Sequence, residues 1–145
     1  MERTFFVAGG DARQRAIVQM LEKRGAAVHS FGFACGDRLT PETVGRLGAA
    51  EVVLLPLPAV DGGGFLHAPA MEKKLPAEML WPLLRPRQKI FGGMLTETVL
   101  RSAAEYHLSL VDYYRREEFV LRNAYITAES ALQLTMERLG QTVRG

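Results

Sequence analysis

The sequence contains little cysteine and almost no excess charge. Cys35 is its one cysteine among 145 residues, which excludes an internal disulfide framework and a cysteine-rich metal site. A lone cysteine is typical of the reducing cytoplasm, where we expect this protein to lie. The formal net charge is +2, and the basic residues are scattered. Such a charge pattern excludes most nucleic-acid-binding proteins.

Long apolar runs and nucleotide-binding motifs are also missing. No apolar run reaches the roughly 18 residues of a membrane span, and residues 1–13 lack the apolar core of a signal peptide. None of the expected strands is followed by a G-x-G-x-x-G motif, and the sequence contains neither a P-loop nor an H-E-x-x-H motif. We therefore expect no membrane contact, and neither a cofactor nor a metal on these residues themselves.

The stretch Thr4–Gln14 has the pattern of a buried strand that passes through two glycines into a helix. An apolar, β-favouring run ends at Gly9 and Gly10. Asp11 is suited to cap the following helix, and Gln14, three residues later, to return a hydrogen bond to the Asp11 amide. The stretch therefore predicts the first βα unit of an α/β domain.

Two interpretations of this unit remain open. A helix start reached through glycines offers free amides and the positive end of the helix dipole to an anion. Arg13 would add a forked cation beside it. The alternative is a well-capped scaffold that binds nothing, which explains Asp11 and Gln14 but not Arg13.

Strand and helix patterns alternate along the whole chain. Expected strands cover residues 5–8, 26–33, 51–57, 89–94 and 108–113, the last as a strand or an extended segment. Expected helices cover residues 12–24, 41–48, 76–84, 97–107 and 128–139. This alternation predicts a three-layer α/β fold, in which a mostly parallel five-stranded sheet has helices on both faces.

Ligands of such sheets bind beyond the carboxyl ends of the strands, where the strand order reverses. Three segments are expected at that edge: 9–14, 56–67 and 92–96. The candidate ligand-binding residues are Gly9, Gly10, Asp11, Arg13, Gln14, Gly92, Gly93, Thr96, Asn123 and Thr127. Residues 59–75 form a long irregular stretch, which is functional or mobile in many domains and otherwise a plain crossover.

Isolated histidine and cysteine side chains carry less information. His67 lies on a candidate site loop and is the default acid or base. His29 lies on an expected strand, where a packed or surface role is more common. Cys35 has no histidine nearby in the sequence, which argues against a nucleophile.

Four motifs occur in a recognisable order: GGDARQ at 9–14, Gly32-Phe33, LPLP at 55–58 and RNAYITAESA at 122–131. In this order they resemble the N-terminal half of dipicolinate synthase A subunits, over almost the whole chain. The last motif is similar to the asparagine and threonine–x–glutamate signature of that family. Ile126 stands where the family often has proline before the threonine.

The resemblance implies a flavodoxin-like substrate domain that precedes a Rossmann domain for a nicotinamide dinucleotide, NAD(P). Residues 142–145 lie about where the first strand of that second domain would begin. We therefore expect residues 1–145 to be a single N-terminal domain, inactive alone, with the dinucleotide-binding domain absent from this chain. The parent protein would act with the B subunit of dipicolinate synthase to oxidise a dihydrodipicolinate-type intermediate of the lysine pathway to dipicolinate, which accumulates in spores. Homo-oligomers remain possible.

The implied substrate is a small dicarboxylate on a six-membered ring, which needs two anion sites. We expect Arg13 and the amides after Gly10 to bind one carboxylate. The 92–96 turn, with Thr96, would bind the other. Asn123 would orient the ring or bridge to the cofactor domain.

Other functions stay open at this point. The domain also fits the substrate domain of another 2-hydroxyacid or alanine dehydrogenase-like oxidoreductase, or a non-enzymatic flavodoxin-like module. A response regulator needs an aspartate at the tip of the third strand, where this sequence has LPLP. A flavin module needs a phosphate loop rich in serine and threonine, which GGDARQ is not.

Overall fold

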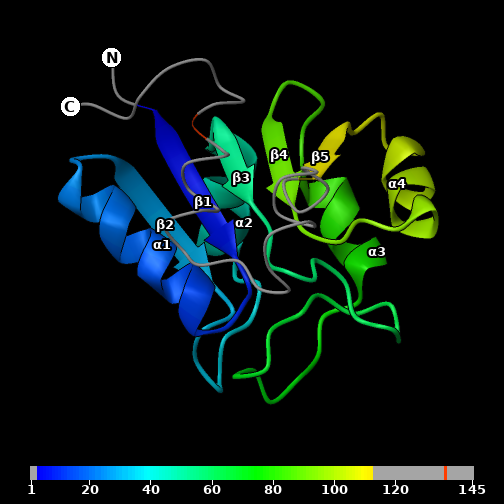
Figure 1. Cartoon of the computed structure of the whole chain (residues 1–145), viewed down its shortest axis with the longest axis horizontal. Coiled ribbons are helices and arrows are strands. Elements are labelled where there is room, and N and C mark those ends of the chain that lie inside the picture. The colour runs from blue at the N-terminus through cyan, green and yellow to red at the C-terminus, as the bar shows by residue number, and fades with distance from the viewer. Residues whose placement is uncertain (1–2, 113–135, 137–145) are drawn as a thin grey trace, which may run out of the picture.

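The computed structural model describes residues 3–112 and Met136. Within residues 3–112 the chain forms one sheet of five parallel strands in the order β2-β1-β3-β4-β5 (Figure 1). The strands are β1 (Thr4–Ala8), β2 (Ala27–Phe31), β3 (Val52–Leu54), β4 (Lys89–Gly92) and β5 (Leu110–Asp112). The helices are α1 (Ala12–Lys23), α2 (Pro41–Ala49), α3 (Ala77–Leu80) with the 3-10 turn η1 (Trp81–Leu83), and α4 (Glu97–Ala104). An all-parallel sheet in this order is flavodoxin-like, so the predicted fold class is confirmed.

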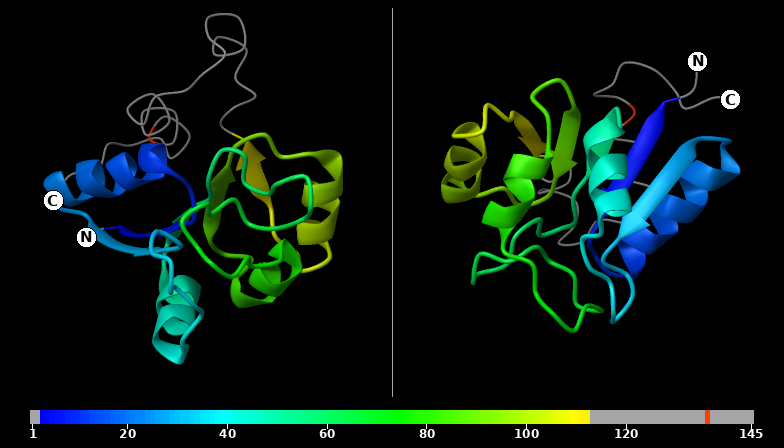
Figure 2. Two further views of the ribbon diagram at one scale, coloured as in Figure 1. Left: turned by 90° about the horizontal axis from the view of Figure 1, so that it is seen from below. Right: turned by 180° about the vertical axis from the view of Figure 1, so that it is seen from behind.

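Side chains of β1 alternate between two separate cores, one on each face of the sheet. Phe5 and Val7 pack with Ile17 of α1, whereas Phe6 packs on the opposite face with Leu47 of α2. The second core also contains residues from α3 and α4. Figure 2 shows α1 on one side of the sheet and α2, α3 and α4 on the other. This arrangement confirms the three layers.

The helices begin at or next to the predicted residues, because short polar side chains accept hydrogen bonds from the first free amides. Asp11 and Gln14 form the predicted capping box at the start of α1. Thr40 caps α2, with Pro41 in the first turn. Thr96 caps α4 by accepting a hydrogen bond from the backbone of that helix. The predicted cap of α1 is therefore confirmed, and α2 and α4 begin with caps of the same kind.

Strand ends differ from the prediction by several residues. The β3 ladder stops at Leu54 instead of position 57, because Pro56 and Pro58 have no amide hydrogen to donate. The β2 ladder stops at Phe31. Beyond it, the Asp37 carboxylate accepts hydrogen bonds from the backbone amides of residues 32, 33 and 34.

The stretch from 59 to 75 contains no helix or strand, as predicted, but local contacts order it. Val60 pairs with Leu66, and Phe65 with Pro76, in antiparallel bridges. The Asp61 carboxylate accepts hydrogen bonds from the backbone of this turn, and the Phe65 amide is the main cause that lowers its pKa below the ordinary value. Local backbone hydrogen bonds thus fold the stretch into a compact turn beneath the sheet edge.

Two glycines provide a test of this packing. A Cβ added at Gly93 would overlap Leu57 Cδ1 and lie 2.9 Å from its Cβ, whereas a Cβ added at Gly45 meets nothing within 4 Å. We expect Gly93→Ala to destabilise the protein by about 1–3 kcal/mol through overpacking. Gly45→Ala should stabilise α2 by about 0.5–1 kcal/mol, since alanine is the better helix former. Urea unfolding measures both, and equal effects of the two substitutions would contradict the described packing.

Candidate functional site

The strand order reverses between β1 and β3, and this position is the switch point of the sheet. The chain leaves β1 toward α1 on one face, and α2, which lies on the other face, leads into β3. Crevices at such points are where open α/β sheets bind ligands. The turn at 9–11 and the loop from 55 to 67 meet there, at the lower edge of the sheet in Figure 1.

Arg13 joins the two segments. Its Nη2 donates to the Leu57 carbonyl at 2.8 Å and to Asp11 Oδ2 at 2.9 Å. Its Nε donates to Asp11 Oδ1 at 3.2 Å. The side chain keeps 32% of its surface exposed, so the guanidinium lies at the switch point within reach of solvent.

Asp11 lies between two basic side chains. Its carboxylate pairs with Arg13, and Oδ2 is also 3.9 Å from Nε2 of His67. The hydrogen bond from the Arg13 side chain is the main cause that lowers the Asp11 pKa, while partial burial opposes it. The structure therefore brings together three of the predicted site residues, with Asp11 as the shared anion.

The amides at the start of α1 have internal partners. The amide of Asp11 donates to Gln14 Oε1 at 3.1 Å, and the amide of Arg13 to Asp11 Oδ1 at 2.9 Å. A Cβ at Gly9 would lie 3.0 Å from the Leu66 side chain. One at Gly10 would overlap Gln14, which is itself buried. The glycines thus permit close packing, and the Arg13 guanidinium is the group placed to attract an anion.

The turn after β4 reaches the same edge. The Gly93 amide donates to the Pro56 carbonyl at 3.0 Å, and the Leu95 amide to Asp112 Oδ2 at 2.8 Å. Gly92 is buried against neighbouring apolar side chains. Thr96 is exposed and uses its oxygen to cap α4. The predicted convergence of three segments is therefore observed, although the amides of Gly93 and Leu95 already donate to the loop after β3 and to the end of β5. Asn123 and Thr127 lie outside the described residues.

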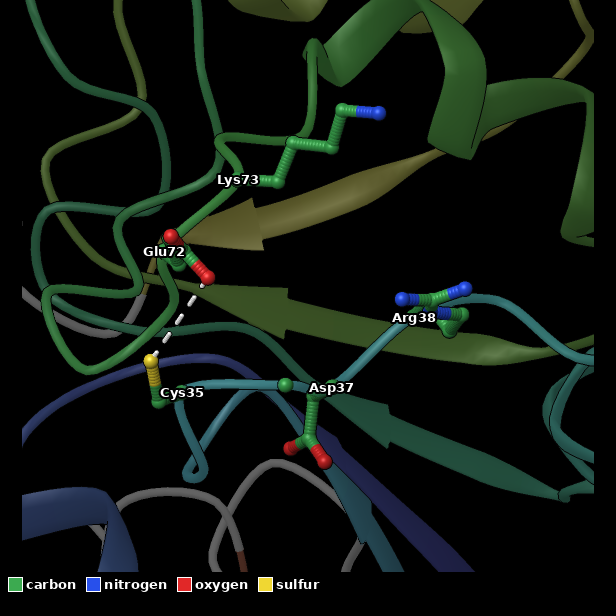
Figure 3. A pocket seen from close by; sticks show the side chains of 6 residues that line it. Cys35, Asp37, Arg38, Glu72 and Lys73 are labelled. Atoms are coloured by element: carbon green, nitrogen blue, oxygen red, sulfur yellow. Dashed lines mark hydrogen bonds between the residues drawn. The ribbon is translucent and has the colours of Figure 1, made fainter.

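Sequence reasoning missed a second feature of this edge. A cavity of about 390 Å³ lies between the β2–α2 loop and residues 72–73, lined by Cys35, Gly36, Asp37, Arg38, Glu72 and Lys73 (Figure 3). Charged side chains next to each other in two separate loops were the available signal. Nothing in the sequence spacing showed that these loops face one another.

Residues 3–112 and Met136 contain no group of three or more His, Cys, Asp or Glu side chains that fits a metal ion. Every helix within those residues is too short or too polar to cross a lipid bilayer.

Comparison with known proteins identifies the family. Residues 4–114 match the profile of the N-terminal domain of the dipicolinate synthase A subunit. The chain belongs to this family. The resemblance inferred from the motif order is thereby confirmed.

Individual dipicolinate synthase relatives agree with this assignment. The dipicolinate synthase A subunit of Bacillus subtilis (strain 168) is 24% identical over 149 aligned positions, which cover 96% of this chain and 49% of the relative. The chain therefore spans about half the length of that relative.

Crystal structures of two such proteins share the fold. The dipicolinate synthase A chain from Bacillus subtilis matches 80% of this chain and 41% of its own, with a TM-score of 0.63 and 21% identity. The dipicolinate synthase A subunit from Bacillus halodurans matches 99% of this chain and 51% of its own, with a TM-score of 0.67 and 19% identity.

The Asp11 ion pair predicts a pH-dependent stability. Because the pKa of Asp11 is lower in the folded state, its charge stabilises the fold above the ordinary value of about 3.9, and this contribution is lost as pH falls through the folded pKa. Asp11→Asn keeps a capping oxygen but removes the charge. We expect the variant to lose about 0.5–1 kcal/mol at pH 7, with the difference shrinking below about pH 4. Urea unfolding at several pH values measures this, and a constant difference would contradict the described pairing.

Proposed function

We propose that this domain contributes part of the substrate site of a dipicolinate synthase A subunit. The protein would take part in oxidising a dihydrodipicolinate-type intermediate to dipicolinate during sporulation, in the cytoplasm and together with the B subunit of that enzyme. The observation that carries this proposal is the partly exposed Arg13 guanidinium at the switch point, in a chain of this family. A guanidinium keeps its charge and attracts a carboxylate, although its Nε and Nη2 already donate to Asp11 and to the Leu57 carbonyl.

One carboxylate of the substrate is assigned to Arg13 in this proposal. The second is assigned to the turn of Gly92 and Gly93, through the side chain of Thr96. The Thr96 oxygen accepts a hydrogen bond from the Val99 amide, and its hydroxyl proton can still be donated to a ligand.

His67 is proposed to take the proton that leaves the ring during oxidation. Oxidation of a dihydro ring removes two hydrogens. One of them would leave as a hydride with both electrons, to NAD(P) on a separate domain, and the other leaves as a proton, so the site needs a base. Asp11, 3.9 Å from His67 Nε2, would stabilise the imidazolium that forms. Its lowered pKa keeps it ionised for this purpose.

NAD(P) does not fit the described residues. A dinucleotide fold places the pyrophosphate at the helix that follows the first strand, and here the Asp11 carboxylate already caps that helix. Two negative groups at one helix start repel each other. We therefore propose that a separate domain binds NAD(P), and that this domain supplies only substrate contacts.

The geometry gives no support to the other modules considered. The end of β3 holds buried Leu55, Pro56 and Leu57, without the acidic group that phosphoryl transfer to a response regulator requires. The Asp11 carboxylate at the start of α1 is equally unfavourable for a flavin phosphate.

Titration of the 145-residue chain with dipicolinate tests the anion site. Arg13→Ala should raise Kd by about tenfold or more, because it removes a charge-assisted hydrogen bond. Arg24→Ala, an exposed arginine at the far end of α1, is the matched control and should leave Kd unchanged. Equal affinity in the Arg13 variant would remove Arg13 from the site.

Steady-state kinetics test His67 in the complete enzyme, which contains the full-length A subunit, the B subunit, NAD(P) and substrate. His67→Gln should lower kcat by about 10²–10⁴-fold with little change in KM, as expected for a lost base. His107→Gln, an exposed histidine after α4, should behave like the unmodified enzyme. A His67 variant with full kcat over the whole pH range would exclude His67 as the base.

A further inference from the structure

The cavity between the β2–α2 loop and residues 72–73 has the dimensions of a small-molecule site. Its volume is about 390 Å³, within the range of about 300–1,000 Å³ that is usual for ligand pockets. Figure 3 shows that its side chains come from two loops that are distant in the sequence. Cys35 and Glu72 face each other across the gap.

Backbone hydrogen bonds hold both walls in place. On one wall, Asp37 Oδ2 accepts hydrogen bonds from the amides of Gly32, Phe33 and Ala34 at 2.9, 3.0 and 3.1 Å. On the other, the Glu72 amide donates to the carbonyl of Cys35 at 3.0 Å. These hydrogen bonds order the β2–α2 loop and join it to the segment that carries Glu72 and Lys73.

In the described part of the chain, the charged side chains that line this cavity form no ion pairs with one another. Within residues 3–112 and Met136, Arg38 and Lys73 form no ion pair, and the Glu72 carboxylate contacts only the Cys35 thiol, at 4.0 Å. Asp37 is already engaged by three amides. Two cations and one carboxylate thus remain available to a ligand.

We propose that this cavity binds a small amino dicarboxylate. The two carboxylates of the ligand pair with Arg38 and Lys73, since a guanidinium takes a carboxylate through two hydrogen bonds and an ammonium takes one as a point charge. The ligand's ammonium pairs with Glu72. A molecule with a net charge of about −1 neutralises the three groups together.

This cavity is separate from the Arg13 site. Residues 66–72, which we call the crossing segment, pass over the ends of β1 and β2 between the two places. A Cβ at Gly9 would lie 3.0 Å from Leu66, and one at Gly32 would lie 3.5 Å from the Ala68 side chain. The two proposed sites therefore use different residues, and each contains its own arginine.

Calorimetric titration of the 145-residue chain with L-aspartate tests the proposal. Arg38→Ala and Lys73→Ala should each raise Kd by about tenfold or more. Glu72→Gln should weaken L-aspartate binding but leave succinate, which has no ammonium, bound equally well or better. Arg13→Ala should not change the affinity for L-aspartate, and Arg38→Ala should not change that for dipicolinate, so failure of one site is distinguishable from failure of the other.

Three results would overturn the proposal. The first is no saturable binding of millimolar L-aspartate to the folded chain. The second is an unchanged Kd in the Arg38 variant, with folding verified by circular dichroism. The third is loss of succinate binding in Glu72→Gln equal to the loss of L-aspartate binding, which would show that Glu72 does not recognise an ammonium.

Discussion

The contact of Arg13 with both Asp11 and the Leu57 carbonyl is the interaction on which the site depends. It ties the first turn of α1 to the loop that follows β3, across the point where the strand order reverses. Without it, the positions of Asp11 and His67 relative to each other would be less defined. One side chain thus provides both a link between the two segments and a positive charge at the switch point.

Local sequence determined the fold to a large extent. The cap of α1 depends on residues 11 and 14 alone, and short polar residues before helices act in the same way in any protein. The alternation of strands and helices was sufficient for a parallel sheet with two covered faces. The ends of β2 and β3 were less predictable, since Asp37 ends the first ladder through contacts that sequence spacing does not reveal.

The sequence predicted that residues 9–14, 56–67 and 92–96 meet at one edge of the sheet, but it predicted the contacts of these residues only in part. The glycines after β1 suggested an open cradle for an anion, because a missing Cβ looks the same in the sequence whether a ligand or another loop fills the space. In the structure, residues 66–67 fill it above Gly9. The pairing of Arg13 with Asp11, two positions away, was likewise not recognised, since the capping role of Asp11 already accounted for its presence.

The path of the crossing segment gives a structural reason for glycine at positions 9 and 32, which does not depend on any ligand. Both residues have positive φ angles, +79° and +94°, and each lies where a side chain would strike the chain above it or the neighbouring strand end. A relative whose backbone follows the same path needs glycine at both points, whatever molecule it binds. Retention of these two glycines therefore reports the course of the polypeptide, whereas the residue at position 13 or 38 would vary with the ligand that we propose for each site.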